Sequence, residues 1–283
     1  SNNFSNGSAK ANLNSRGIGI YAGTTTEFKM DDSNVTGNYG LPDNSAYGIA
    51  HGAGIYITST KDNYIKDSKI SNNEVGYENN RGFSNGGGIY AAGKLDIENT
   101  EIFGNKALEG GGIHFAGTIL NISNTHIYSN IAKGFQSMNS GLGGGIYVEK
   151  GDVIIKDGTI IGGDNESEGN YSDNLGGGIY QAGGTLTLEA TSLGKIKVNN
   201  NHTSKYIIAG EEHSGAGIYS KATLKLDKIE IAYNKTSDIG SGGGIYSSSA
   251  STITNSIIEN NNANNGAGIY KANGDINLYN TRL

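Results

Sequence analysis

A run of oxygen-bearing side chains at 164–173 is the first feature of this sequence with possible chemistry. Asp164, Glu166, Glu168 and Asp173 place carboxylates at roughly alternate positions, and carboxylate oxygens in a loop are ligands that suit Ca²⁺. The run lacks the bidentate glutamate that closes an EF-hand loop at its twelfth position, so it is not an EF-hand. We expect a solvated acidic loop, with calcium binding as the alternative, and we predict no other cofactor.

His114 is the second candidate, because it stands alone at a position that related segments fill with tyrosine. A catalytic histidine is normally supported by a carboxylate, and no acidic residue at a fixed spacing accompanies His114. We interpret it as a tolerated exchange of one aromatic ring for another, and we assign no catalytic residue.

The loops around His114 suggest a binding role instead. The connection 106–109 that precedes it is short, whereas the loops 74–85 and 131–142 on either side are long and carry aromatic residues. A concave apolar notch offers more buried contact per residue than a flat face. The residues expected to line this ligand-binding notch are Tyr77, Phe83, His114, Phe135 and Met138.

A repeated five-residue phrase must position these residues. It reads GIGIY, GAGIY, GGGIY or GGGIH and recurs nine times, at intervals of 24 to 39 residues. Such a period is the signature of a solenoid, in which each repeat packs on its neighbours. The phrase begins at Gly17, Gly52, Gly86, Gly110, Gly143, Gly176, Gly215, Gly242 and Gly266.

The tyrosine that ends the phrase should face away from the core, because side chains of a strand alternate between its two faces. A column of these rings, with Tyr180 and Tyr219 near its centre, has two interpretations. It is either an aromatic strip that contacts sugar rings or a partner protein, or a stack of rings that stabilises the sheet without a ligand.

Each phrase is followed by further short segments in which apolar residues recur with a period of two. This predicts an all-β fold, a parallel β-helix of about nine coils with three short strands each, as a single domain over 1–283. A helical fold is excluded because glycine triplets would cost a helix about 1 kcal/mol per glycine. Variable loops should emerge at one corner only, between the asparagine step and the next phrase.

An asparagine recurs at the end of most repeats and predicts a ladder of turns, because asparagine tolerates a left-handed backbone. Gly163 takes its place in the fifth repeat. The predicted ladder residues are Asn38, Asn73, Asn105, Asn130, Asn234 and Asn261.

Composition excludes several classes of function. A net charge of −6 and a pI near 5.4 leave no basic surface for nucleic acid. No apolar run approaches the length of a membrane span, so no membrane insertion by this segment is expected. The absence of cysteine excludes disulfides, cysteine-bound zinc and thiol catalysis.

The repeat resembles a known type. GG-x-I phrases such as 86–89, paired with an apolar-x-x-Asn step such as 102–105, are similar to the GGA(I/L/V) and FxxN repeats of chlamydial polymorphic outer membrane proteins and of adhesin-like surface proteins of methanogens and anaerobic bacteria. The resemblance covers about Gly17 to Leu283. It implies a right-handed parallel β-helix displayed at the cell surface as an adhesin or passenger. This sequence departs in having Gly or Ala before the Ile, and Ile where the family has Phe.

Two functions follow as expectations. The first is a non-enzymatic, extracellular, cell-surface module that resembles an adhesin and binds a protein or glycan of a host or neighbouring cell, or acts as a stalk. For this function we expect the chain to continue into further coils or an anchoring domain, with the export signal and the anchor outside this segment. The second is a polysaccharide-binding or polysaccharide-degrading β-helix, such as a lyase or a tailspike-like glycoside hydrolase. The outward positions considered, from Lys29 to Asn277, carry no carboxylate pair on adjacent coils, which disfavours the enzyme.

Overall fold

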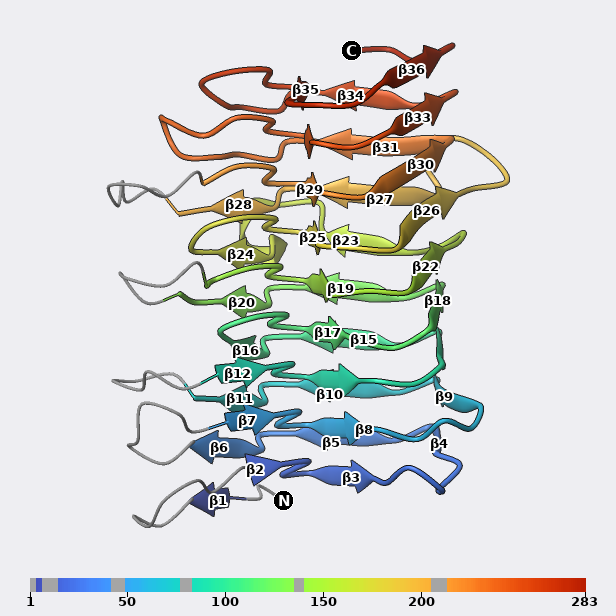
Figure 1. Cartoon of the computed structure of the whole chain (residues 1–283), viewed down its shortest axis with the longest axis vertical. Helices are drawn as coiled ribbons and strands as arrows, with labels where there is room; N and C mark the ends of the chain where they lie inside the picture. Colours follow the sequence, from blue (N-terminus) through green and yellow to red (C-terminus); the bar gives the residue numbers. More distant parts are fainter. Residues whose placement is uncertain (1–3, 7–14, 42–48, 77–82, 135–139, 205–212) are drawn as a thin grey trace.

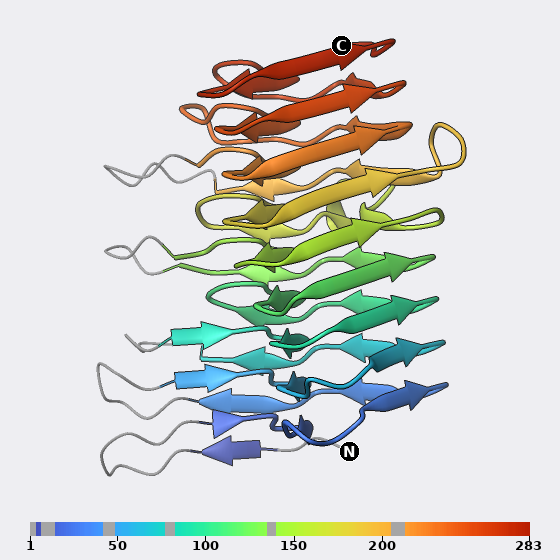
Figure 2. The same cartoon turned by 45° about the vertical axis from the view of Figure 1, so that its right-hand side comes forward.

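The computed structural model describes residues 4–6, 15–41, 49–76, 83–134, 140–204 and 213–283. In Figures 1 and 2 the strands lie one above another, and the chain rises from the first coil to the ninth. Within each sheet the strands pair in parallel with the equivalent strands of the coils before and after, for example Ile89 with Ile113 and Leu95 with Leu120. The predicted parallel β-helix is therefore confirmed.

Three sheets enclose the main core. The first sheet consists of β3 (Ile20–Ala22), β8 (Ile55–Ile57), β13 (Ile89–Ala91), β17 (Ile113–Phe115), β21 (Ile146–Val148), β25 (Ile179–Gln181), β29 (Ile218–Ser220), β32 (Ile245–Ser247) and β35 (Ile269–Lys271). The second sheet consists of β4 (Lys29–Asp31), β9 (Asn63–Lys66), β14 (Leu95–Glu98), β18 (Ile119–Ser123), β22 (Asp152–Ile155), β26 (Thr185–Glu189), β30 (Thr223–Asp227), β33 (Ser251–Thr254) and β36 (Ile276–Tyr279). The third sheet consists of β5 (Asn34–Thr36), β10 (Lys69–Ser71), β15 (Glu101–Phe103), β19 (His126–Tyr128), β23 (Ile160–Gly162), β27 (Ile196–Asn199), β31 (Ile229–Ala232) and β34 (Ile257–Glu259).

Two further sheets form an arm beside this body, at the left of Figure 1. Strands leading away from the body are β1 (Phe4–Asn6), β6 (Tyr39–Leu41), β11 (Glu74–Val75), β16 (Lys106–Ala107), β20 (Ile131–Ala132), β24 (Tyr171–Ser172) and β28 (His202–Thr203). Strands returning to it are β2 (Ser15–Arg16), β7 (Ile49–His51) and β12 (Phe83–Asn85). Ala50, Ala53, Val75 and Ala107 form a second, small core in the arm. Part of what the sequence predicts as loop is thus paired strand.

The main core contains the isoleucine column predicted from the phrase. Ile55, Ile89 and Ile146 are fully buried, and Leu95 and Ile97 of the second sheet pack in the same cluster. Burying each such side chain contributes about 1.5–3 kcal/mol, and only stacked neighbours provide that burial.

The asparagine ladder exists and is longer than predicted. Its side chains are hydrogen-bonded from each coil to the next at Asn38, Asn73, Asn105, Asn130, Asn170, Asn201, Asn234 and Asn261. Asn170, not Gly163, occupies the fifth position, because an insertion with the 3₁₀ turn η1 (Glu166–Glu168) shifts the register.

The predicted reason for these asparagines is wrong. The left-handed backbone falls on the residue before the ladder position, with φ of 54° at Asn72 and 64° at Gly104. The ladder asparagine itself is buried and binds backbone: Nδ2 of Asn105 donates to the carbonyl of Ile70 at 2.9 Å.

The ladder also explains a glycine of the phrase. A Cβ on Gly88 would lie 2.6 Å from the carbonyl oxygen of Gly112 and 3.1 Å from Cγ of Asn105. The two halves of the repeat therefore depend on each other, since the ladder occupies the space that a side chain at this position would need.

Candidate functional site

The loop 190–195, between β26 and β27, is the element that most alters the surface of the body. The equivalent connection is two residues long in several coils, for example 99–100 and 124–125. Variable loops therefore emerge at a second corner, which corrects the expectation of a single one. Loops on a rigid scaffold are the usual place for binding residues.

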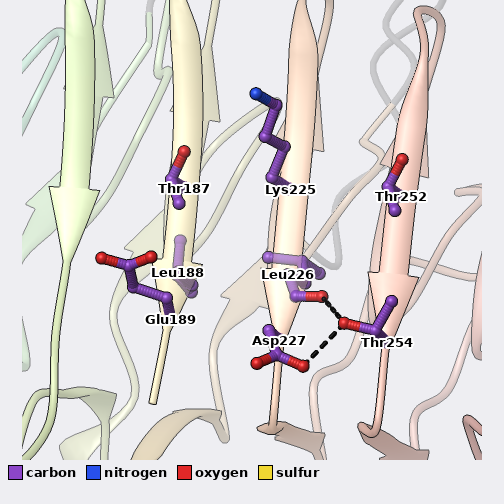
Figure 3. A pocket seen from close by; sticks show the side chains of 8 residues that line it. All are labelled: Thr187, Leu188, Glu189, Lys225, Leu226, Asp227, Thr252 and Thr254. Carbon is purple, nitrogen blue, oxygen red and sulfur yellow. Dashed lines mark hydrogen bonds between the residues drawn. The ribbon is translucent and has the colours of Figure 1, made fainter. Parts of the chain in front are cut away.

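A hollow of about 270 Å³ opens beside this loop on the second sheet. Figure 3 shows that it is lined by residues of three neighbouring strands, β26, β30 and β33, of which Leu188 and Leu226 belong to the buried core. The side chains of Glu189 and Lys225 have no hydrogen-bond or ion-pair partner in the described part of the chain. The lining residues are Thr187, Leu188, Glu189, Lys225, Leu226, Asp227, Thr252 and Thr254.

Two more hollows border the same loop. The second hollow, of about 530 Å³, is lined by Lys156, Asp157, Ala190 and Thr191. It shares the residues Glu189 and Asp227 with the first hollow. The other, also about 530 Å³, lies where Leu193 faces the corner of the last coils. We call the first two hollows together the thumb groove, with loop 190–195 as its thumb.

Glu189 and Asp227 are register partners on adjacent strands, so the thumb groove contains a carboxylate pair on neighbouring coils. This corrects the sequence analysis, which considered only one of the two outward positions of each strand. On the next two strands of the sheet, β33 and β36, the register partners of Asp227 are Thr254 and then Tyr279. Tyr279 is 59% exposed.

Asp227 is held in one orientation. Its Oδ1 accepts from Thr254 Oγ1 at 2.7 Å and Asn255 Nδ2 at 2.8 Å, and its Oδ2 lies 2.9 Å from Nζ of Lys228. These contacts, the Thr254 hydrogen bond first, lower the pKa of Asp227 to about 2. Asp227 is therefore an ionised acceptor at neutral pH.

The tyrosine column is a stack of rings that is buried at Tyr180 and Tyr219. Tyr180 and Tyr219 are only 4% and 3% exposed, and their ring centroids lie 5.3 Å apart with planes inclined by 10°. Leu142 and Leu175 of the returning chain pack against them. The rings face away from the main core as expected, but the arm covers them, so Tyr180 and Tyr219 do not form an exposed ligand-binding face.

His114 also lies in this column, at 1% exposure, between the rings of Tyr90 and Tyr147 at 5.1 and 4.5 Å. It does have carboxylate partners: Glu149 Oε2 is 3.4 Å from Nε2 and Glu109 Oε2 is 3.8 Å from Nδ1. The expectation of an unsupported histidine is wrong, because Glu149 comes from the next coil.

The predicted notch is only partly within the described residues. Phe83 is 59% exposed on β12, whereas the burial of His114 removes it from any open notch. Tyr77, Phe135 and Met138 lie outside the described residues.

Three of the four carboxylates of the acidic loop have separate partners. Asp164 pairs with Lys197 at 3.6 Å, Glu168 accepts from the backbone N–H of Asp164, and Asp173 accepts from the Tyr171 hydroxyl at 2.8 Å. Among the described residues, no three acidic or histidine side chains converge as a metal site requires. Calcium binding by Asp164, Glu166, Glu168 and Asp173 stays a prediction that a titration can test.

Comparison of the chain with protein-family models, curated proteins and solved structures gives no match. The class assignment therefore comes from the fold and the repeat, and the adhesin-type resemblance stays an expectation. No helix in the described ranges has the length and apolar character needed to cross a membrane.

Proposed function

We propose that this chain is an extracellular, adhesin-like β-helix module that binds a glycan of a host or neighbouring cell in the thumb groove. The observation that supports this most is the gathering of three hollows around one inserted loop on an otherwise regular stack. A rigid scaffold with one irregular, open groove is typical of a binding module.

The chemistry of the groove suits a neutral or mixed-charge sugar chain. Thr187 and Thr252 supply hydroxyls, Lys225 a donor and Glu189 an acceptor, all aimed outward (Figure 3). Coils are about 4.8 Å apart, close to the length of one pyranose unit, so a chain lying along the axis would meet similar groups at each step. The exposed ring of Tyr279 offers a stacking surface beside Thr254.

A glycan array followed by calorimetry tests this function. The double variant Lys225→Ala/Thr252→Val should weaken binding at least tenfold, while the matched variant Lys66→Ala on β9, the same sheet far from the groove, should bind as the wild type does. If the groove variant kept full affinity, or if no glycan bound, the proposal would be abandoned.

The second candidate is a glycoside hydrolase, and the Glu189–Asp227 pair is the observation that favours it. The low pKa of Asp227 suits a nucleophile or base but not a proton donor, so Glu189 would have to donate the proton. Release of reducing ends by the wild type and its loss in Glu189→Gln would replace binding with catalysis as the function.

A further inference from the structure

At the fourth coil, two titratable side chains make the contact between the arm and the body. Glu109 ends the chain segment that returns from the arm, in register with Asn85 before it and Leu142 after it. His114, five residues later, belongs to the first sheet. The side chains of Glu109 and His114 therefore join the returning chain to the body at this coil.

The next two coils make the same junction with leucine and tyrosine. Leu142 and Leu175 stand where the fourth coil has Glu109, and Tyr147 and Tyr180 stand where it has His114. These leucines and tyrosines form one buried apolar cluster. The fourth coil has exchanged both members of that pair for titratable groups.

The geometry around His114 favours a proton on the carboxyl group of Glu109. Nε2 faces Glu149 Oε2 at 3.4 Å, so the tautomer that carries its hydrogen on Nε2 is favoured. Nδ1 is then a lone pair directed at Glu109 Oε2, 3.8 Å away. Two acceptors facing each other repel, whereas a protonated Glu109 would be attracted to the ring nitrogen.

No other polar group relieves this contact within the described residues. His114 Nδ1 is buried without a hydrogen bond, and so are Asn85 Oδ1 and His51 Nδ1 in the coils before it. A buried polar atom without a partner is costly, so this region is poised to respond to a change in charge.

We propose that Glu109, His114 and Glu149 form a proton-operated lock between the returning chain of the arm and the first sheet, closed at mildly acidic pH and loosened above neutrality. Glu149 holds the imidazole, and the proton on Glu109 closes the contact. Loss of that proton places a carboxylate beside a second carboxylate and a lone pair.

The surrounding charges agree with this direction. Burial first, and then Glu149, raise the pKa of Glu109 to about 7. Burial lowers the pKa of His114, against the opposing effect of the hydrogen bond that its Nε2 donates to Glu149, and that bond lowers the pKa of Glu149.

Other titratable groups near the lock carry little charge at neutral pH. Burial lowers the pKa of His51 to about 3 and raises that of Tyr90 to about 12, and the pKa of Tyr147 is raised by burial and by Glu109. Of the cations, Lys150 acts on Glu149, and Arg16 acts on His51 and Tyr90. Neither cation is among the groups that act on Glu109.

The sign of the pH effect follows from linkage. A carboxyl whose pKa is about 7 when folded, and near its ordinary 4.3 when unfolded, favours folding below pH 4 and loses that contribution as pH rises through 7. The buried histidines act oppositely, because the unfolded chain gains protons below about pH 6.5. Between pH 6 and 8.5 the two effects are of the same order, so the contribution of Glu109 is isolated by comparing the wild type with Glu109→Gln, which keeps the histidines.

Hydrogen exchange between pH 6 and 8.5, corrected for the intrinsic dependence on pH, tests the lock. Between pH 6 and 8.5, peptides covering 106–114 in the wild type should lose about tenfold more protection than the same peptides of Glu109→Gln, while those of β30 should respond alike in the two proteins. Glu109→Gln keeps a neutral donor and the histidines, so it should not lose protection as pH rises.

The double variant Glu109→Leu/His114→Tyr restores the pair found in the next two coils and should also be insensitive to pH. A wild type whose protection changes with pH as that of Glu109→Gln does would overturn the proposal, and so would a double variant with the same pH response as the wild type. If the double variant failed to fold, Glu109→Gln alone would decide, since a pH response like that of the wild type contradicts the lock.

Discussion

The backbone N–H and the side-chain Nδ2 of Asn105 both donate to one oxygen, Oδ1 of Asn130, at 3.1 and 3.0 Å. Asn130 repeats this arrangement with Asn170. Each ladder side chain thus satisfies the backbone of the coil before it, and its removal leaves several buried groups unpaired at once.

Asn130→Ala should therefore destabilise the protein strongly. The substitution orphans the N–H and Nδ2 of Asn105 and the carbonyl of Ile102, a loss of about 3–5 kcal/mol. Urea unfolding followed by circular dichroism measures it. Asn99→Gly is the control, because Asn99 belongs to an exposed ladder with Asn124 and has a left-handed backbone, φ 48°, that glycine adopts freely, and it should cost under about 1 kcal/mol. Equal losses for the two variants would show that burial of the ladder is not what matters.

Gly88→Ala should cost about 1–3 kcal/mol or more, because its Cβ would lie 2.6 Å from a backbone oxygen of the next coil. Gly268 has the same place in the phrase, but a Cβ there meets only Cγ2 of Ile258, at 3.6 Å. Gly268→Ala should change the unfolding free energy by less than about 0.5 kcal/mol. A tolerated Gly88→Ala would contradict the dependence of the phrase on the ladder.

Tyr219→Ser should lower stability by about 3 kcal/mol, since it removes a ring that is 3% exposed and stacked on both neighbours. Tyr21, at the other end of the column, is 56% exposed, and Tyr21→Ser should cost under about 1 kcal/mol. Thermal unfolding of both variants makes the comparison. A neutral Tyr219→Ser would reopen the interpretation of the column as a binding strip.

The fold was predictable because it depends on patterns that repeat in the sequence, the isoleucine column and the glycine phrase. The arm was not, because strands such as β16 contain two residues, Lys106 and Ala107, which is too few to show alternation. Alternation also gives only the direction of a side chain. It placed Tyr219 away from the main core but could not show that the arm covers it.

The candidate sites were missed for a different reason. The Glu189–Asp227 pair and the Glu149–His114 contact both join residues of successive coils, 38 and 35 positions apart. Aligning all outward positions of every coil, instead of one position per strand, would have revealed the first. The second also needs the burial of His114, which depends on the packing of the arm.

Asp227→Asn should lower stability at neutral pH, with an effect that fades in acid. The pKa of Asp227 is about 2 when folded and near its ordinary value of 3.9 when unfolded, so its contribution is present above pH 4 and is lost as pH falls through 2. Because the side chain is 35% exposed, we expect about 1 kcal/mol at pH 7. Urea midpoints of the wild type and variant between pH 2 and 7 should converge at the acid end. A constant difference across that range would contradict an electrostatic origin.

Shortening the loop 190–195 to the Asn-Thr turn of the third coil should separate binding from folding. The loop is held at the surface, where Thr191 donates from its N–H to Asp157 at 2.8 Å and Leu193 stays 46% exposed. Of the loop only Ala190 packs in the main core cluster, neither the ladder nor the isoleucine column uses it, and a shorter connection loses less entropy on closure, so the melting temperature should change by only a few degrees. The part of the thumb groove that Ala190 and Thr191 line would be gone, and affinity for a glycan identified with the wild type should fall at least tenfold. Full affinity in the shortened protein would place recognition elsewhere, whereas loss of the β-sheet circular dichroism signal would mean that the loop is needed for folding.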